Sequence, residues 1–439
     1  MAERPVRFPA LRALRHRDYR LYLGGQLVSL VGTWMQSVAQ SWLVYRLTGS
    51  SVLLGLMGFA GQIPMLLLAP LGGSLADTRD RHRIVVVSQA VAMLLAFLLA
   101  GLTLSGHVRL WEVFTLAFLA GVVNAFDVPA RQAFVVEMVG RDDLMNAIAL
   151  NSSMVNGARV IGPALAGLLV AAVGEGWCFA INGLSFLAVL AGLLRMTRDL
   201  RPAARAREAG ASALGHVAEG FAYVSRTPPV RSLLALLGLI SLMGMPYSVL
   251  MPIYADRILH AGPRGLGLLM GASGLGALLG ALRLAFRKDL RGLGRWVATA
   301  TASFGVCLVA FAWSTSLWLS TLILVPAGFS VMVQMAASNT LIQSMVPDRL
   351  RGRVMAIYAM MFMGVTPFGA LMAGLLATTL GAPGTVALGG VACLAGAAVF
   401  ALNLPTFRLQ ARELVGQART AAAPPPEVRA GGEAVASSG

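Results

Sequence analysis

The chain has 439 residues, of which 57% are hydrophobic and 12% are charged, and its mean hydropathy is +0.73. Because soluble domains carry about 25% charged residues, this composition excludes an ordinary soluble protein and predicts a chain that buries its surface in lipid. The formal net charge of +16 suggests nucleic acid as a partner, but the distribution of the charges gives it another explanation.

Apolar runs of about 20 residues recur along the chain, which is the length that a helix needs to cross the hydrocarbon core of a bilayer. The runs are continuous and not alternating, so they predict helices and not the strands of a barrel. We therefore expect an all-α integral membrane protein with twelve transmembrane helices. The expected spans are 21–46, 53–76, 84–106, 110–134, 145–174, 177–196, 231–255, 265–287, 294–314, 317–342, 353–380 and 385–405.

The basic residues favour the loops on one side of these spans. With a cytoplasmic N-terminus, all but five of the 35 Lys and Arg residues lie in inner segments. The exceptions are Arg46, Arg109, Arg257 and Arg264 on the outer side and Arg159 inside a span. This is the positive-inside bias, so the charge reports topology and needs no nucleic acid to explain it. We expect both termini in the cytoplasm and the protein in the plasma (inner) membrane of a bacterium.

The second half of the chain repeats the first at a fixed offset of 207 residues. The matched positions include Gly121 with Gly328, Gly157 with Gly364, Gly162 with Gly369, and Ala166-Gly167 with Ala373-Gly374. Two homologous six-helix bundles are therefore expected, at 21–196 and 231–405. Such halves are typical of secondary transporters that rock around a site at the membrane midplane.

Three further segments flank these bundles. Residues 1–20 are expected to form a cytoplasmic N-terminal segment. Residues 197–230 form a cytoplasmic linker, whose amphipathic stretch Leu214–Val224 predicts a helix on the inner surface. Residues 406–439 become rich in Ala, Pro and Gly, which predicts a disordered cytoplasmic tail.

The loop between the second and third spans reads Gly73-x-x-x-Asp77, followed by Arg79, Arg81 and Arg83. It resembles the signature loop of the major facilitator superfamily. The segments at 14–36, 41–51 and 126–134 further resemble the branch that contains the enterobactin exporters and related drug-efflux proteins.

This resemblance implies a conformational lock. Asp77 would meet the N-terminus of the eleventh span, where a carboxylate is favourable. A basic residue of the loop, with Arg81 as first choice, would pair with Asp127 near the inner end of the fourth span. The equivalent loop of the second half has Leu284 in place of the Asp. The expected lock residues are Gly73, Asp77, Arg79, Arg81, Asp127 and Arg131.

The fifth span contains Gly162-Pro163-x-x-Ala166-Gly167, which resembles the antiporter signature of exporters in this superfamily. Pro163 removes one backbone hydrogen bond and kinks the helix. The small residues allow a neighbouring helix to approach closely. An ordinary packing helix and an antiporter motif both remain open at this point.

Polar side chains in the spans provide candidates for a cargo site. On the first span Gln26, Ser29, Thr33, Ser37 and Gln40 share one helical face, which must meet a cavity or a neighbouring helix because lipid cannot pair it. Hydrogen bonding between helices is the alternative to cargo binding. The complete set of cargo-lining candidates is Gln26, Thr33, Trp34, Ser37, Gln40, Asn124, Asn156, Arg159, Gln334 and Tyr358.

Arg159 differs from the other candidates because it places a charge near the bilayer centre, where ionisable residues are costly. It would either hold an anionic cargo or form a structural pair with a carboxylate, such as Asp127, or with carbonyl groups. The acids considered for proton coupling are Asp127, Glu112 and Asp256, and the sequence does not choose among them.

Together these features predict a monomeric secondary active exporter of amphipathic small molecules, such as a siderophore, a drug or a secondary metabolite. It would work by alternating access in the lipid bilayer, with proton antiport as the expected driving force. An importer of the same fold is the alternative, and a membrane-embedded enzyme or scramblase is a remote one. No nucleophile–base pair, metal-ligand cluster or phosphate-binding loop is recognised, so we expect no enzymatic activity, no metal and no cofactor.

Overall fold

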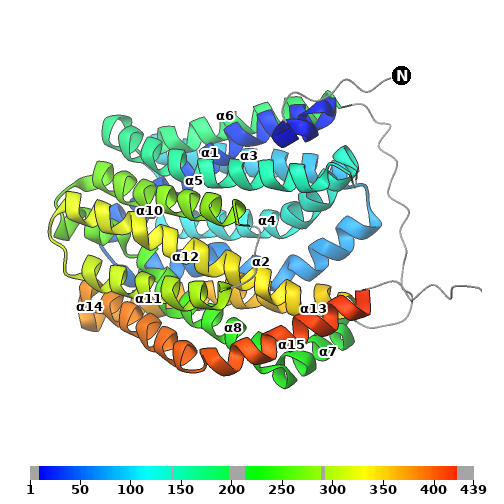
Figure 1. Ribbon diagram of the computed structural model, residues 1–439. Coiled ribbons are helices and arrows are strands. Elements are labelled where there is room, and N and C mark those ends of the chain that lie inside the picture. The colour runs from blue at the N-terminus through cyan, green and yellow to red at the C-terminus, as the bar shows by residue number, and fades with distance from the viewer. Residues whose placement is uncertain (1–8, 141, 197–212, 288–291, 423–439) are drawn as a thin grey trace, which may run out of the picture.

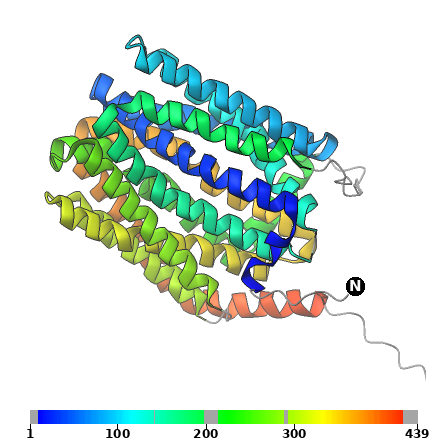
Figure 2. The ribbon, with the colours of Figure 1, turned by 90° about the horizontal axis from the view of Figure 1, so that it is seen from above.

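The computed structural model describes residues 9–140, 142–196, 213–287 and 292–422, and within these ranges the chain is helical with no β-strand. The first half contains η1 (Pro9–Arg15), α1 (Arg17–Thr48), α2 (Ser51–Thr78), α3 (Arg81–Leu104), α4 (Leu110–Val139), α5 (Leu144–Val173) and α6 (Glu175–Leu194). The second half contains α10 (Gly262–Ala285), α11 (Leu293–Ala312), α12 (Leu317–Met345), α13 (Asp348–Ala359) and α14 (Thr366–Leu402). The long helices run side by side, as Figures 1 and 2 show.

The first helix of the second half is interrupted. It begins as α8 (Pro228–Leu239) and continues to residue 258 through short turns. These turns are η2 (Ile240–Gly244), η3 (Met245–Ser248), α9 (Met251–Ile253) and η4 (Tyr254–Ile258). Pro246 and Pro252 lie in this stretch, and each removes a backbone donor that a regular helix needs.

Among the described residues, ten segments are long and apolar enough to cross a membrane. The 32-residue α1 is not among them, because polar side chains on it lower its hydropathy. The 55-residue segment Asp348–Leu402 counts as one of the ten, but Gly381 interrupts it with a φ of 69° and a ψ of 169°. Dividing this segment at Gly381 and including α1 makes the structure consistent with the twelve predicted spans.

The position of this break follows the sequence repeat. Gly381 lies 207 residues after Gly174, which ends α5 with a φ of 90° and a ψ of 172°. Both glycines adopt a positive φ that other residues rarely tolerate. The two halves therefore turn the chain with the same residue at the same place.

The two bundles meet mainly through two helix pairs. Helix α5 packs against α10, and α2 packs against α14. In Figure 1, α1, α3, α5 and α6 lie on one side of the molecule, and α8, α11 and α14 lie on the other. Helix α7 (Ala213–Arg226) occupies the place of the predicted amphipathic helix and packs against α13.

The prediction of a disordered tail from residue 406 is wrong for its first part. Helix α15 covers Leu404–Ala422, and Phe407 is buried against Phe400 with the ring centroids 5.1 Å apart. Ala411 is also buried, at helical spacing from Phe407. The apolar face of this segment gives the helix a surface to pack on, which composition alone did not reveal. Residues 1–8, 197–212 and 423–439 of the predicted segments lie outside the described residues.

Candidate functional site

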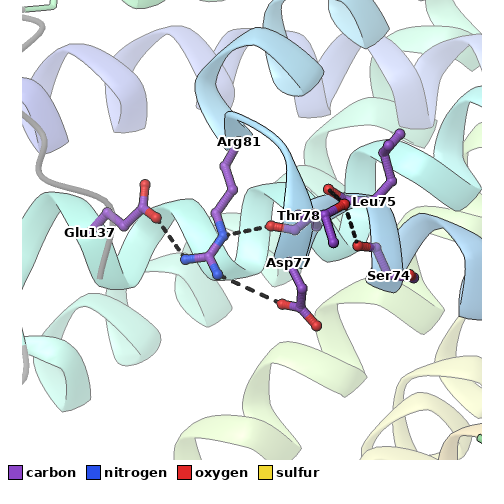
Figure 3. A network of polar contacts seen from close by, with 7 residues as sticks. Ser74, Leu75, Asp77, Thr78, Arg81 and Glu137 are labelled. Atoms are coloured by element: carbon purple, nitrogen blue, oxygen red, sulfur yellow. Dashed lines mark hydrogen bonds and ion pairs between the residues drawn. The ribbon is translucent and has the colours of Figure 1, made fainter. Parts of the chain in front are cut away.

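Arg81, the first residue of α3, connects the ends of three helices (Figure 3). Its Nη1 donates to Oε1 of Glu137 on α4 at 2.7 Å, and its Nε donates to the carbonyl oxygen of Ala76 on α2 at 2.9 Å. Its Nη2 lies 3.7 Å from Oδ1 of Asp77. The side chains of Arg81 and Glu137 are only 12% and 10% exposed. Arg81 therefore holds together the α2–α3 turn and the end of α4.

The predicted pairing of Arg81 with Asp127 is wrong. Asp127 lies twelve residues before the last residue of α4, which is about 18 Å along the helix axis at 1.5 Å per residue. Glu137 lies two residues before that end, at the level of the start of the antiparallel α3. Helix depth was the signal that would have identified Glu137, which the sequence analysis missed.

Asp127 forms a separate, deeper cluster. Its Oδ2 lies 3.0 Å from Nη2 of Arg131 on the same helix, and its Oδ1 accepts a hydrogen bond of 3.0 Å from Nε2 of Gln89 on α3. Asp127 is 3% exposed, so both carboxylate oxygens are paired away from solvent. The six predicted lock residues therefore do not form one network. Arg131 and Asp127 lie deep in the bundle, and Asp77 and Arg81 lie at its end.

The lock is not engaged across the two halves. The side chain of Asp77 is 77% exposed, and the expected contact with the N-terminus of the eleventh span, here Asp348 of α13, is not made. A methyl group placed on Gly73 would meet no atom within 4 Å. Arg79 is exposed and its backbone N–H donates to the carbonyl of Leu75. We call this end of the molecule, with Gly73–Arg83 and Asp348–Arg353, the loop end.

The opposite end, which we call the closed end, is bridged between the halves. It comprises Tyr45–Gly55, Asp256–Gly267 and Gly374–Gly381. Tyr45 donates its hydroxyl proton to Oδ2 of Asp256 at 2.7 Å, and Arg257 donates to the carbonyl of Gly49 at 3.2 Å. The hydroxyl of Ser51 donates to the carbonyl of Gly374 at 2.9 Å. Each of these hydrogen bonds joins one half to the other.

Two glycine contacts complete the closed end. A methyl group on Gly167 of α5 would lie 2.8 Å from Cα of Gly267 on α10. A methyl group on Gly374 of α14 would lie 2.6 Å from the carbonyl oxygen of Ser51 and 3.0 Å from Cα of Gly55 on α2. The distances of 2.8 and 2.6 Å are too short for real side chains, so the backbones approach this closely only because these residues are glycines. Gly167 and Gly374 are equivalent residues of the repeat.

The antiporter-like motif packs on two helices. A methyl group on Gly162 would lie 2.5 Å from Cβ of Trp34 on α1, whereas Gly167 faces α10 of the other half. Pro163 and Ala166 are buried, and a methyl group on Gly267 would lie 2.6 Å from the Pro163 carbonyl oxygen. The contacts of the motif are therefore those of a packing helix. One of them, the contact with α10, lies in the interface between the halves.

Half of the cargo-lining candidates are exposed or partly exposed. The exposed side chains are those of Thr33, Ser37 and Asn124, and Trp34 and Arg159 are partly exposed. The buried candidates are Gln26, Gln40, Asn156, Gln334 and Tyr358.

Four of the five buried candidates make hydrogen bonds within their own half, whereas Oε1 of Gln26 is buried with no hydrogen-bond partner among the described residues. Gln40 donates to the carbonyl of Val113, and Tyr358 donates to the carbonyl of Met335. Asn156 donates to a carbonyl one turn earlier on its own helix. For Gln40, Asn156 and Tyr358, hydrogen bonding inside the bundle, and not a cargo wall, matches the observed contacts.

Arg159 lies beside Trp34. Its guanidinium carbon is 5.7 Å from the centroid of the indole ring, within the range of a cation–π contact. Within the described part of the chain, no carboxylate lies within 4.0 Å of it, and Asp127 is paired with Arg131 instead. The alternative that pairs Arg159 with Asp127 is wrong. Its backbone borders the other half, because a methyl group on Gly274 would lie 2.6 Å from its carbonyl oxygen.

The repeat relates a charged pair to a neutral one. The residues equivalent to Asp127 and Arg131 are Gln334 and Ser338 of α12. Nε2 of Gln334 donates to Oγ of Ser338 at 3.2 Å, over the same four-residue interval. Gln334 and Ser338 are fully buried. One geometry therefore carries an ion pair in the first half and an uncharged hydrogen bond in the second.

A further charged cluster, which the sequence analysis missed, surrounds Asp143 just before α5. Its carboxylate lies 3.0 Å from Nε of Arg12, 2.8 Å from Nε of Arg15 and 2.8 Å from Nε2 of His16. The hydrogen bond with His16, followed by the charges of Arg15 and Arg12, lowers the pKa of Asp143 below its usual value. The N-terminal segment is thereby fastened to the start of α5.

The fold, the repeat and the loop motif point to one family. A family model described as transmembrane secretion effector matches residues 9–431. The chain belongs to the major facilitator superfamily. Within the described ranges, this transporter has no group of three His, Cys, Asp or Glu side chains that suits a metal ion.

Its relatives include named exporters. The transporter is 29% identical to the multidrug efflux pump Tap of Mycolicibacterium fortuitum, over 88% of this chain and 96% of the relative. It is 23% identical to the staphyloferrin A transporter of Staphylococcus aureus, over 87% and 95% of the two chains. It is 24% identical to the enterobactin exporter EntS of Shigella boydii, over 82% and 85%. The resemblance to the siderophore and drug-efflux branch is confirmed.

Solved transporters share the fold. A bacterial homologue of the lysosomal transporter Spinster, inward-facing and unoccupied, matches with a TM-score of 0.65 and 15% identity, over 91% of this chain and 98% of that one. An inward-facing bacterial homologue of ferroportin matches with a TM-score of 0.64 and 18% identity, over 88% and 98%. This likeness confirms the predicted all-helical, multi-span fold.

Proposed function

We propose that the protein is a secondary active exporter of amphipathic small molecules, working by alternating access in the bacterial inner membrane. The cargo class is that of siderophores, drugs or secondary metabolites, in keeping with the named activities of the relatives. One observation carries the mechanism. The halves are bridged at the closed end, through Tyr45 and Asp256, while Asp77 at the loop end is exposed.

The orientation follows from the positive-inside bias. With both termini in the cytoplasm, the loop end faces the cytoplasm and the closed end faces outward. The described conformation is then inward-facing. Rocking would separate the Gly167–Gly267 and Gly55–Gly374 contacts and bring Asp77 and Gly73 towards α13, which would engage the lock.

We propose that cargo is held between the halves by Arg159 and Trp34, with Thr33, Ser37 and Asn124 along the approach. Arg159 presents a positive charge that no described carboxylate neutralises at contact distance. A cargo with an acidic group and an aromatic or apolar body would complement it, because the charge is strong in a medium of low dielectric constant.

Proton antiport is the proposed driving force, with Asp127 as the acid that exchanges the proton. Of the three acids considered, Asp127 alone is buried within the transmembrane part. Glu112 accepts a hydrogen bond from the backbone N–H of Arg109 and so caps α4. Asp256 belongs to the closed end.

Everted membrane vesicles provide the test. A panel of fluorescent drugs and siderophores is offered to vesicles that carry the wild type, Asp127→Asn or Glu112→Gln, with an imposed proton gradient. We expect cargo to accumulate in wild-type and Glu112→Gln vesicles and to dissipate the gradient, and Asp127→Asn to uncouple the two. Movement in the opposite direction would identify an importer, and accumulation without proton flux would exclude antiport.

A further inference from the structure

Arg353 on α13 is held by the linker that joins the two halves. Its guanidinium forms an ion pair with the carboxylate of Glu219 on α7. The side chains of Arg353 and Glu219 are 25% and 47% exposed, so the pair lies at the surface of the loop end. A methyl group on Gly220 would lie 3.3 Å from Cβ of Arg353, so the two helices are closely packed there. In the described conformation the charge of Arg353 is therefore paired on the side of α7.

The contacts between the halves place Asp77 and Arg353 at the same depth. As α2 proceeds towards its end, its close contacts move backwards along α14 and η5 (Met360–Gly364), so the segments are antiparallel. A methyl group on Gly364 would lie 2.7 Å from Cδ1 of Leu66 on α2. Asp77 lies eleven residues after Leu66, and Arg353 lies eleven residues before Gly364. Both therefore lie about 16 Å nearer the loop end, to within about one helical turn.

The two helices are separated at this level in the described conformation. Helix α2 packs against α14 and η5, whereas α13 packs mainly against α7. The side chain of Asp77 is 77% exposed and lies 3.7 Å from Nη2 of Arg81. The rocking motion of the proposed function closes the loop end, and it would bring the carboxylate of Asp77 to the guanidinium of Arg353.

The internal repeat supports an interaction between α2 and α13 at this position. The residues equivalent to Asp77 and Arg353 are Leu284 and Asn146. One copy of the contact therefore carries both charges, and the other copy carries neither. Asn146 still contacts the segment equivalent to α7, because its Oδ1 accepts a hydrogen bond of 2.8 Å from the backbone N–H of Ala13. The docking of this segment is common to the halves, whereas the charges are specific to α2 and α13.

We propose that Arg353 exchanges ion-pair partners during the transport cycle. It pairs with Glu219 when the loop end is open and with Asp77 when the loop end is closed. Helix α7 thereby acts as a latch that favours the open loop end. Exposed ion pairs are weak, so the exchange shifts the balance between the two states without trapping either of them. The inference rests on the proposed alternating access, but not on the cargo, the direction of transport or the coupling ion.

The test measures the opening of the loop end in the purified full-length transporter, without cargo or a proton gradient. Spin labels are attached through Leu194→Cys and Leu402→Cys, at the exposed ends of α6 and α14, one in each half. Double electron–electron resonance reports the distance between them. We expect Glu219→Gln to raise the ratio of the short to the long distance, and Asp77→Asn to lower it. Each change should be roughly two- to fivefold, since an exposed ion pair contributes up to about 1 kcal/mol.

A second set of variants tests whether both carboxylates act through Arg353. In an Arg353→Gln background, Glu219→Gln and Asp77→Asn should lose their effects, because the shared guanidinium is absent. Glu413→Gln is the matched control, since Glu413 is an exposed carboxylate on α15, a different helix. This control should leave the distance distribution unchanged.

Three results would overturn the proposal. An unchanged distribution in Glu219→Gln would mean that α7 does not bias the loop end. Shifts of Glu219→Gln and Asp77→Asn in the same direction would contradict an exchange between two states. Persistence of either shift in the Arg353→Gln background would assign the carboxylates to another cation. Both carboxylates are exposed, so their neutral variants should fold as the wild type does. Cargo movement is read separately in the vesicle assay, which distinguishes a failure of export from a failure of the exchange.

Discussion

The guanidinium of Arg81 and the carboxylate of Glu137 form a hydrogen-bonded ion pair, 2.7 Å long, between the start of α3 and the end of α4. Both side chains are nearly buried, and Glu137→Gln removes the closest counter-ion of Arg81, leaving the exposed Asp77 at 3.7 Å. Breaking a buried ion pair destabilises proteins by up to about 3 kcal/mol. We therefore expect Glu137→Gln to lower the melting temperature clearly in a thermal-shift assay.

Asp77→Asn is the matched comparison for that variant, because Asp77 also faces Arg81 but is 77% exposed. An exposed pair contributes only about 0.2–1 kcal/mol, so the melting temperature should hardly change. If Asp77 acts in the outward-facing lock, transport should fall nevertheless. Equal loss of stability in both variants would contradict this division of roles.

The closed end should open when a side chain is introduced at its glycine contacts. Gly167→Val places a branched side chain where a methyl group already lies 2.8 Å from Gly267, so the halves must separate there. The distance between spin labels at Leu47 and Thr378, one in each half, should lengthen when it is measured by double electron–electron resonance. Gly157→Ala is the control on the same helix, since a methyl group there meets no atom within 4 Å. An unchanged distance distribution in Gly167→Val would show that this contact does not govern the closed end.

Asp143 should stabilise the folded protein through the N-terminal segment. We expect Asp143→Asn to lower the melting temperature, whereas Asp142→Asn, at the exposed neighbouring position, should have little effect. The folded pKa of Asp143 is depressed, so its contribution is present above the unfolded value of about 3.9 and is lost as the pH falls through the lower folded value. The advantage of the wild type should persist at pH 5, and its disappearance there would contradict this assignment.

Arg159 should determine the charge preference of transport. We expect Arg159→Gln to reduce export of acidic cargo more than tenfold while neutral cargo is affected less, because a charged hydrogen bond contributes about 1.5–3 kcal/mol. Arg159→Lys should retain part of the activity. The control is Arg109→Gln, at the exposed start of α4. Equal loss for acidic and neutral cargo, or unchanged export of both, would assign Arg159 a role other than cargo recognition.

The sequence predicted the arrangement of helices well because hydropathy and the repeat both report it directly. Gly174, which ends α5, is equivalent in the repeat to Gly381, where the helix α14 is interrupted. The partner of Arg81 was missed because pairing depends on depth along α4, which a one-dimensional pattern does not supply. The exposure of Asp77 depends on which conformation the transporter occupies, and one sequence encodes both.

The polar stripe on α1 shows a different limit. Gln26, Thr33, Ser37 and Gln40 share one face, yet the residues at both ends of the stripe are buried and the central ones are exposed. Periodicity identifies the face of a helix but not where along its length a neighbour ends. The small residues of the antiporter-like motif allowed close helix packing as one of two interpretations, but the sequence does not indicate that α1 and α10 are the helices in contact.

The charged pair of α4 and its neutral counterpart on α12 limit how the halves can respond to acid. Protonation of Asp127 would leave Arg131 as a partly buried cation without this counter-ion, whereas no ordinary change of pH alters the charge of Gln334 or Ser338. The repeat therefore preserves the contact between residues four apart at this position but not its charge. Under the proposed proton antiport, only the first half would respond to acid at this position, and the second half would keep its uncharged hydrogen bond.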